Sequence, residues 1–131
     1  MDDELERIRE EKLRKLMEKF TKKEEASRKP VNLDSKNFDC FIKNNRIVLV
    51  DFWANWCMPC RIFAPEFEKL AEELKGRAVL GKVNVDLAPD IAARFNVRGI
   101  PTTILFKNGR EVKRFIGVQS KDTLKRAISL G

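Results

Sequence analysis

Two of the three cysteines in this 131-residue chain, Cys57 and Cys60, are separated by only two residues, Met58 and Pro59. At this spacing one thiol can attack a disulfide in another molecule, and the second thiol can then attack the mixed disulfide that results. The pair would thereby exchange a dithiol for a disulfide. The sequence therefore offers a centre for thiol–disulfide exchange.

Two other interpretations of the cysteine pair compete with redox exchange. The same spacing is half of a zinc site, but zinc takes four ligands, and this chain has only Cys40 as a further cysteine and no histidine. A purely structural disulfide would close a loop too short to gain much stability from cross-linking. Redox exchange is the favoured interpretation, and we expect the Cys57–Cys60 pair to work without a metal or another cofactor.

The residues on either side predict where the pair lies in the fold. Residues 47–53 are almost all apolar and rich in β-branched and aromatic types, which is typical of a strand buried on both faces. After the pair, Gly76 favours the end of a helix, and apolar residues recur at helical spacing before it, at Phe63, Phe67, Leu70, Ala71 and Leu74. The cysteines are therefore predicted at a strand-to-helix junction.

This position distinguishes the two thiols. Free backbone N–H groups and the helix dipole lower the pKa of a thiol at the first turn of a helix. We therefore expect Cys57 to be the attacking nucleophile and Cys60, one turn further on, to be the less accessible resolving thiol. Pro59 suits the first turn, where its missing N–H would have had no partner.

Asp51 places a carboxyl group inside the apolar run that precedes the cysteines. Burial would raise its pKa, so that it could take and return the proton of Cys60. Alternatively, Asp51 simply ends the strand at the surface, although Phe52 and Trp53 still follow it. Lys82, in the strand-like run 78–84, is a candidate partner for Asp51 or else a solvated lysine on that strand.

Taken together, the chain resembles the thioredoxin family over about residues 31–131. The matching segments occur in the family's order and at its spacings: Val50-Asp51-Phe52-Trp53-Ala54, Trp56-Cys57-Met58-Pro59-Cys60, Pro65, Lys82-Val83-Asn84-Val85-Asp86, Gly99-Ile100-Pro101-Thr102, Phe106-Lys107-Asn108-Gly109 and Gly117.

The resemblance implies further site residues around the cysteines. Pro101 matches the family's cis-proline, and with Ile100 and Gly99 it would present backbone groups to an extended substrate segment, unless it is a trans proline that opens a strand. Trp56 and Gly117 match positions beside the substrate groove.

Met58 and Pro59 belong to the same expected contact surface. Met58 departs from the glycine of most classical thioredoxins and leaves the redox potential and the choice of partner open.

The remaining pattern predicts an α/β fold with a central mixed sheet flanked by helices on both faces. Strands are expected near 31–33, 46–53, 78–84, 102–107 and 111–116, with helices near 35–43, 89–95 and 120–130. Asn108-Gly109 predicts a hairpin. Cys40, beside Phe38 and Phe41, is expected to be a buried bystander, with a regulatory thiol as the alternative.

Residues 1–30 are predicted to form a separate, charged helical extension to a domain at 31–131. Acidic and basic residues four apart support a helix, and its ragged apolar stripe would either remain solvated or contact a partner, a second copy or the domain itself. This segment lacks the features of a signal peptide or a mitochondrial presequence.

Net charge is +7, but the basic residues are scattered without interleaved aromatic residues, so nucleic acid and membrane are not the expected partners. We expect a cytoplasmic enzyme that reduces protein disulfides and is itself restored by a reductase. A disulfide oxidase or isomerase is the alternative within the enzyme class. A redox-switched binding module that uses the N-terminal helix is the alternative outside it.

Overall fold

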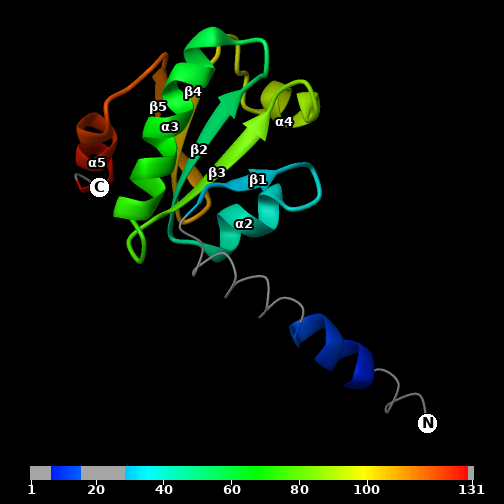
Figure 1. Cartoon of the computed structure of the whole chain (residues 1–131). Helices are drawn as coiled ribbons and strands as arrows, with labels where there is room; N and C mark the ends of the chain where they lie inside the picture. Colours follow the sequence, from blue (N-terminus) through cyan, green and yellow to red (C-terminus); the bar gives the residue numbers. More distant parts are fainter. Residues whose placement is uncertain (1–6, 16–28, 130–131) are drawn as a thin grey trace.

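The computed structural model describes residues 7–15 and 29–129 (Figure 1). From residue 29 onward the order is β1 (Val31–Leu33), α2 (Phe38–Asn44), β2 (Ile47–Trp53), α3 (Met58–Glu73), β3 (Val79–Asn84), α4 (Pro89–Arg94), β4 (Thr102–Lys107), β5 (Arg110–Ile116) and α5 (Lys121–Ser129).

The five strands form one mixed sheet in the order β1-β3-β2-β4-β5. Strands β1, β3 and β2 pair in parallel, whereas β4 pairs antiparallel with both β2 and β5. The predicted fold class is confirmed. Strand β2, which leads into the cysteine pair, lies at the centre of the sheet.

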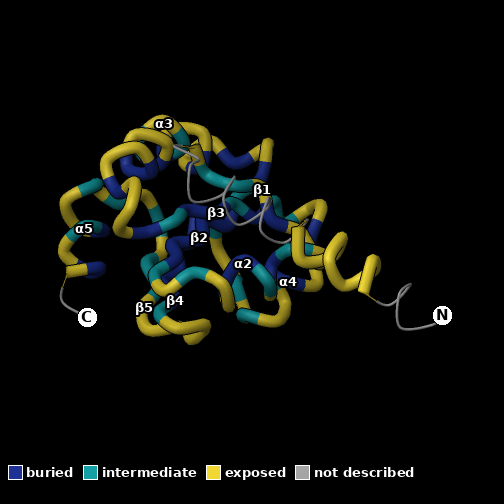
Figure 2. Tube along the Cα trace, turned by 90° about the horizontal axis from the view of Figure 1, so that it is seen from below, coloured by how far each residue is buried: buried dark blue, intermediate teal, exposed yellow. Residues whose placement is uncertain are grey.

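Side chains that alternate along the strands divide the core into two layers. Val48, Val50 and Phe52 of β2 pack with buried residues of α2 and α4, whereas Leu49 packs with buried residues of α3 and α5. The sheet is therefore covered by helices on both faces, and its central strands are buried (Figure 2). This arrangement explains why β2 is almost entirely apolar.

The β4–β5 hairpin turns at Asn108 and Gly109, as predicted. Both residues have positive φ, 53° and 80°, which is the backbone conformation of the tight hairpin turn that asparagine and glycine favour. The second strand starts at Arg110, one residue before the predicted start.

The predicted start of the helix at Ser35 is wrong, because α2 begins at Phe38. The side chain of Asp34 accepts hydrogen bonds from the backbone N–H groups of Lys36 and Asn37, at 2.8 and 3.2 Å. An aspartate that bonds to the backbone two and three residues ahead forms a turn in place of a helix.

The prediction that Cys40 is buried is also wrong. Cys40 lies on α2 but is half-buried, and its sulfur accepts a hydrogen bond from the side-chain amide of Asn44 at 3.0 Å. The neighbouring Phe38 and Phe41 take the core positions of this helix instead.

Residues 7–15 are helical, and every one of them is exposed. Ile8 and Leu13 carry the predicted apolar stripe here, with 48% and 64% of their surfaces exposed. The rest of the predicted N-terminal helix, at 1–6 and 16–28, lies outside the described residues. Within the described parts of the chain, no helix has both the length and the apolar character needed to cross a membrane.

Candidate active site

Cys57 and Cys60 lie where β2 passes into α3, as predicted. Cys57 is the N-cap residue of α3, with extended backbone angles, and its N–H donates to the carbonyl of Ala54 at 3.2 Å. Pro59 lies in the first turn of the helix. The backbone N–H of Cys60 donates to the sulfur of Cys57 at 3.3 Å, so the first turn of the helix is directed at that sulfur.

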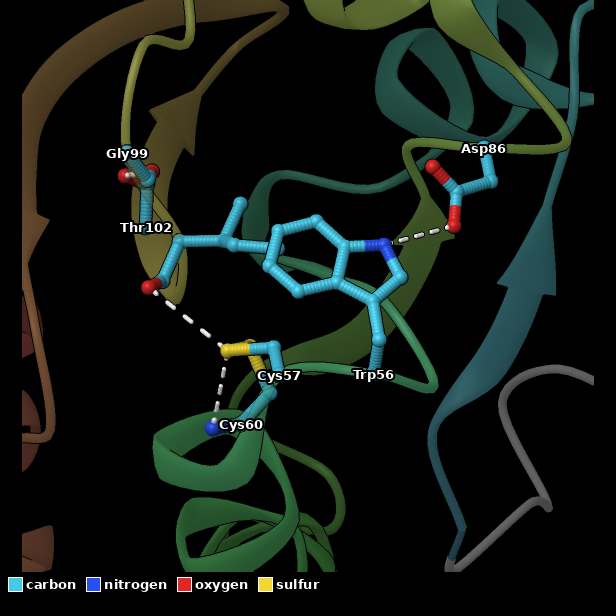
Figure 3. The surroundings of a disulfide bond; sticks show 7 residues. Trp56, Cys57, Cys60, Asp86, Gly99 and Thr102 are labelled. Carbon is cyan, nitrogen blue, oxygen red and sulfur yellow. Dashed lines mark hydrogen bonds between the residues drawn. A yellow bond between two sulfur atoms is a disulfide. The ribbon is translucent and has the colours of Figure 1, made fainter.

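The two cysteines are joined by a disulfide, with a Cα–Cα distance of 5.3 Å (Figure 3). Both are buried in this oxidised form, with 4% of Cys57 and 2% of Cys60 exposed. This small difference does not separate an accessible thiol from a hidden one. What distinguishes Cys57 is its place at the helix N-terminus.

The segment before β4 approaches the disulfide from across the site. The carbonyl oxygen of Ile100 lies 3.7 Å from the sulfur of Cys57, and the Ile100–Pro101 peptide bond is cis, as predicted. The hydroxyl of Thr102 donates to the carbonyl of Gly99 at 2.5 Å. This bond fastens the exposed Gly99 to the buried start of β4.

Gly117 is hydrogen-bonded to the same segment, at Pro101. Its backbone N–H donates to the carbonyl of Pro101 at 2.8 Å, and its φ of 91° is a conformation that favours glycine. The predicted groove residues Gly99, Ile100, Pro101 and Gly117 are thus brought together at one end of the sheet.

Trp56 and Met58 project from the junction into solvent, with 71% and 60% of their surfaces exposed. The indole N–H of Trp56 donates to the Asp86 carboxylate at 2.9 Å, which fixes the ring beside the disulfide (Figure 3). Sequence reasoning did not assign a role to Asp86. Its place two residues after the end of β3 was the available signal, since the ends of parallel strands meet at one edge of a sheet.

Further apolar side chains are exposed near these segments. They were not predicted as site residues, and they are Ile62, Leu87, Ile116 and Val118.

Asp51 is completely buried on the face of β2 that α3 covers. Leu49, two residues before it, packs with Phe63 and Phe67 of α3, and Trp53, two residues after it, packs against the cysteine pair. Asp51 therefore lies beneath the start of α3. Loss of water around the carboxyl raises its pKa from 3.8 to about 7, with the positive charge of Lys82 opposing the rise.

Lys82 is the neighbour of Asp51 on β3, but the two side chains do not form a direct ion pair. The carboxylate oxygens of Asp51 have no hydrogen-bond partner among the described residues, and the ammonium of Lys82 lies 4.5 Å from the centroid of the Trp53 ring. Lys82 acts on Asp51 through its charge while its head contacts an aromatic face.

The arrangement supports disulfide exchange. It unites a redox-active cysteine pair, a helix N-terminus and a buried carboxyl group of raised pKa, which are the parts that activate and resolve thiols. Within residues 7–15 and 29–129, no three His, Cys, Asp or Glu side chains are grouped so that they could hold a metal ion.

Comparison with known proteins identifies the same chemistry. The sequence model of the family described as Thioredoxin matches residues 29–130. A thioredoxin from Alicyclobacillus acidocaldarius is 43% identical over 76% of this chain and 94% of its own length. The chloroplastic M-type thioredoxin of Spinacia oleracea is 39% identical over 82% of this chain and 60% of its own length.

Solved structures agree with the sequence comparison. A mutant thioredoxin from Halobacterium salinarum superposes with a TM-score of 0.73 at 36% identity, covering 79% of this chain and 90% of the other. Thioredoxins reduce protein disulfides and use no cofactor beyond their redox-active cysteines. The matched residues include the Cys57–Cys60 pair, and the chain is a protein-disulfide reductase that belongs to the thioredoxin family.

Proposed function

We propose that Cys57 is the attacking nucleophile of disulfide reduction and that Cys60 is the resolving thiol. The observation that carries this assignment is the 3.3 Å contact from the Cys60 N–H to the Cys57 sulfur at the N-terminus of α3. In the reduced protein the same N–H groups and the helix dipole stabilise a thiolate on Cys57. Cys60 lies inside the first turn and not at the N-cap, so the free N–H groups of the helix do not stabilise a thiolate on it in the same way.

The first chemical step forms a mixed disulfide. The Cys57 thiolate attacks one sulfur of a substrate disulfide, the S–S bond of the substrate breaks, and the departing thiolate takes a proton from water. In the second step Cys60 gives its proton to Asp51, and the Cys60 thiolate attacks the Cys57 sulfur. The second substrate thiolate leaves and is protonated, so the substrate gains two electrons and the Cys57–Cys60 disulfide forms.

Asp51 is proposed as the base for Cys60 because it is buried beneath the start of α3 and has a pKa of about 7. A base whose pKa lies near the working pH exchanges protons in both directions. Lys82 supports the ionised form of Asp51 through its charge. Without that charge the carboxylate would be harder to form inside the core.

Substrate proteins are proposed to bind as an extended segment across Gly99, Ile100 and Pro101. Two backbone groups of this segment are held in place, since Pro101 accepts from Gly117 and Gly99 accepts from Thr102. Gly99 is exposed and Ile100 is half-buried, so an extended chain can reach the backbone of this segment and pair with it. Trp56 and the adjacent exposed apolar side chains would contact the flanking residues of the substrate.

The protein is proposed to work in the cytoplasm, in the direction of reduction, where ordinary thiols are kept reduced. A thioredoxin reductase is the proposed source of electrons. A bifunctional thioredoxin reductase/thioredoxin from Mycobacterium leprae, which is 43% identical over 73% of this chain and 21% of its own length, supports that pairing.

Reduction of insulin by dithiothreitol tests the assignment of the two thiols. We expect Cys57→Ser and Cys60→Ser each to abolish the catalysed rate, whereas Cys40→Ser keeps it because Cys40 lies on α2 away from the disulfide. After limited alkylation of the reduced native protein near neutral pH, peptide mapping should find the label on Cys57. Label on Cys60 alone would reverse the two roles.

The N-terminal segment is proposed to contact another protein or a second copy of the chain. The support is its exposed helix at 7–15 with Ile8 and Leu13 open to solvent. In the full-length protein, Ile8→Glu with Leu13→Glu should lower the molar mass measured by light scattering or the recovery of partners. If both measurements stayed at native values, this segment would have no such role.

A further inference from the structure

Thr103 is a buried polar residue to which neither the fold nor the exchange reaction assigns a task. It lies on β4 and has no exposed surface. Its hydroxyl makes no hydrogen bond with any group in the described parts of the chain. Leaving such a group without a partner destabilises the fold. A valine has nearly the same shape and would avoid this cost, so strand packing alone does not explain the threonine.

The register of the sheet places Thr103 directly opposite Asp51. Strands β2 and β4 run antiparallel, and Asp51 pairs with Thr103. Residues that face each other in this way have Cβ atoms about 4.5 to 5.5 Å apart on the same side of the sheet. Both carboxylate oxygens of Asp51 also lack a hydrogen-bond partner among the described residues, so two unsatisfied polar side chains lie side by side.

The side chains of Thr103 and Asp51 lie on the face of the sheet that packs against α3 and the cysteine pair. Leu105, two residues after Thr103, packs in the layer of α3 and α5, and Trp53, two residues after Asp51, packs against Cys57 and Cys60. Alternation along each strand therefore puts the hydroxyl and the carboxyl together beneath the start of α3.

Two neutral polar groups on this face lack a hydrogen-bond partner among the described residues, the hydroxyl of Thr103 and the indole N–H of Trp53, and of the two only Thr103 lies directly opposite Asp51 in the strand register. Strand β3 contributes Lys82, whose ammonium contacts the ring of Trp53. Helix α3 contributes the cysteine pair, and the buried side chains of α5 are all apolar, at Leu124, Ala127 and Ile128. No other strand pairs with β2, because β3 and β4 are its two neighbours.

We propose that Thr103 is a positioning residue for Asp51, whose carboxyl group its hydroxyl hydrogen-bonds during proton transfer from Cys60. When Asp51 is ionised the hydroxyl donates to it, and when Asp51 holds the proton the hydroxyl accepts from it. A turn of either side chain or one bridging water completes the bond. The hydroxyl thus keeps the carboxyl directed toward α3 through both halves of the exchange.

This inference rests on the proposed role of Asp51, and a double-mutant cycle separates the two. The chains compared are the native protein, Thr103→Val, Thr103→Ser, Asp51→Asn and the Thr103→Val/Asp51→Asn pair. The readouts are the pKa of Asp51, followed by carboxyl ¹³C NMR in the oxidised protein, and the pH profile of insulin reduction. Valine preserves the shape of threonine, and serine preserves its hydroxyl.

Thr103→Val should raise the pKa of Asp51 by about one pH unit, because an ionised carboxylate that loses a donor is harder to form. The pH profile of turnover should move by a similar amount, and Thr103→Ser should restore both. In the Asp51→Asn background, Thr103→Val should have no further effect on the rate. A chain that did not fold with valine would be replaced by Thr103→Ala, which also lacks the hydroxyl.

The two possible failures look different. If Thr103→Val left both the pKa of Asp51 and the pH profile unchanged while Asp51→Asn altered the profile, Thr103 would have only a structural role. If Asp51→Asn itself left the pH profile unchanged, the proposed role of Asp51 would be lost, and with it the reaction step that Thr103 is proposed to assist.

Discussion

Replacing Asp51 by asparagine should change how the stability of the folded protein depends on pH. Asp51 is the only ionisable carboxyl group that is fully buried in the described residues. Burial raises its pKa from 3.8 to about 7, against the opposing charge of Lys82. The folded protein therefore binds this proton more tightly than the unfolded chain does. The contribution of Asp51 to stability must fall as the pH rises from about 4 to about 7, and this loss is complete above that range.

The size of the effect follows from the pKa difference. At about 1.4 kcal/mol for each pH unit, the ionised carboxyl destabilises the fold by about 4 kcal/mol at alkaline pH. Roughly 60% of this loss falls between pH 5 and pH 9, because the unfolded chain is already mostly ionised at pH 5. Asparagine has nearly the same size as aspartate but does not titrate, so the Asp51→Asn variant lacks this pH-dependent loss of stability.

Urea unfolding of the oxidised protein at pH 5 and pH 9 measures the prediction, since the disulfide keeps both active-site cysteines from titrating. The unfolding free energy of the native chain minus that of Asp51→Asn should fall by about 2 to 3 kcal/mol between the two pH values. Asp90→Asn is the control, because Asp90 is exposed in the folded protein. If the unfolding free energies of the native chain and of Asp51→Asn changed by the same amount between pH 5 and pH 9, burial of Asp51 would not raise its pKa as described.

Two further substitutions test the surface of the site and the packing behind it. Trp56→Ala should lower kcat/KM for insulin about fivefold, the equivalent of about 1 kcal/mol of aromatic contact, while a small aromatic disulfide is reduced at nearly the native rate. If kcat/KM fell equally for both substrates, Trp56, whose indole donates to Asp86, would act in the exchange reaction and not in binding of the protein substrate. Arg114→Met should lower the unfolding free energy by about 1 kcal/mol, because the carbonyl of Phe95 loses a donor at 2.8 Å and the carboxylate of Glu111 loses its ion-pair partner. Lys113→Met, on the same strand, is its control, and equal values for both variants would deny the contacts of Arg114 any stabilising role.

Much of the site could be predicted because its signals are local. The apolar run continues past Asp51 to Phe52 and Trp53, and a strand that is buried on both of its sides cannot place one residue in water without a bend. The cysteines follow where the pattern changes from strand to helix, and this junction is confirmed. The burial of Asp51 and the strand-to-helix position of Cys57 are consequences of that short stretch alone.

The sequence predictions that proved wrong concern places where two local patterns compete or where a contact depends on residues distant in the sequence. The Asp34 turn replaces the first turn of the predicted helix, because a side-chain acceptor competes with the helical hydrogen bonds. Cys40 turns away from the core because Phe38 and Phe41 occupy the inner face of its short helix. Apolar neighbours in sequence did not indicate which side of the helix the thiol would occupy.

Thr103 shows the limit of sequence reasoning most clearly. Its relation to Asp51 depends on the register between β2 and β4, and a shift of one residue would move the hydroxyl to the other face of the sheet. Alternation along β4 alone shows that Thr103 and Leu105 share a face. Only the paired strands show that this face holds the buried carboxyl.

The central claim is that Cys57 attacks the substrate and Cys60 releases it. The most direct test is to mix reduced Cys60→Ser protein with oxidised insulin, digest the covalent product without reductant, and map the linked peptides by mass spectrometry. The account predicts a mixed disulfide between Cys57 and an insulin cysteine, and no such product from Cys57→Ser under the same conditions. A mixed disulfide through Cys40, or one that formed equally well with Cys57→Ser, would contradict it.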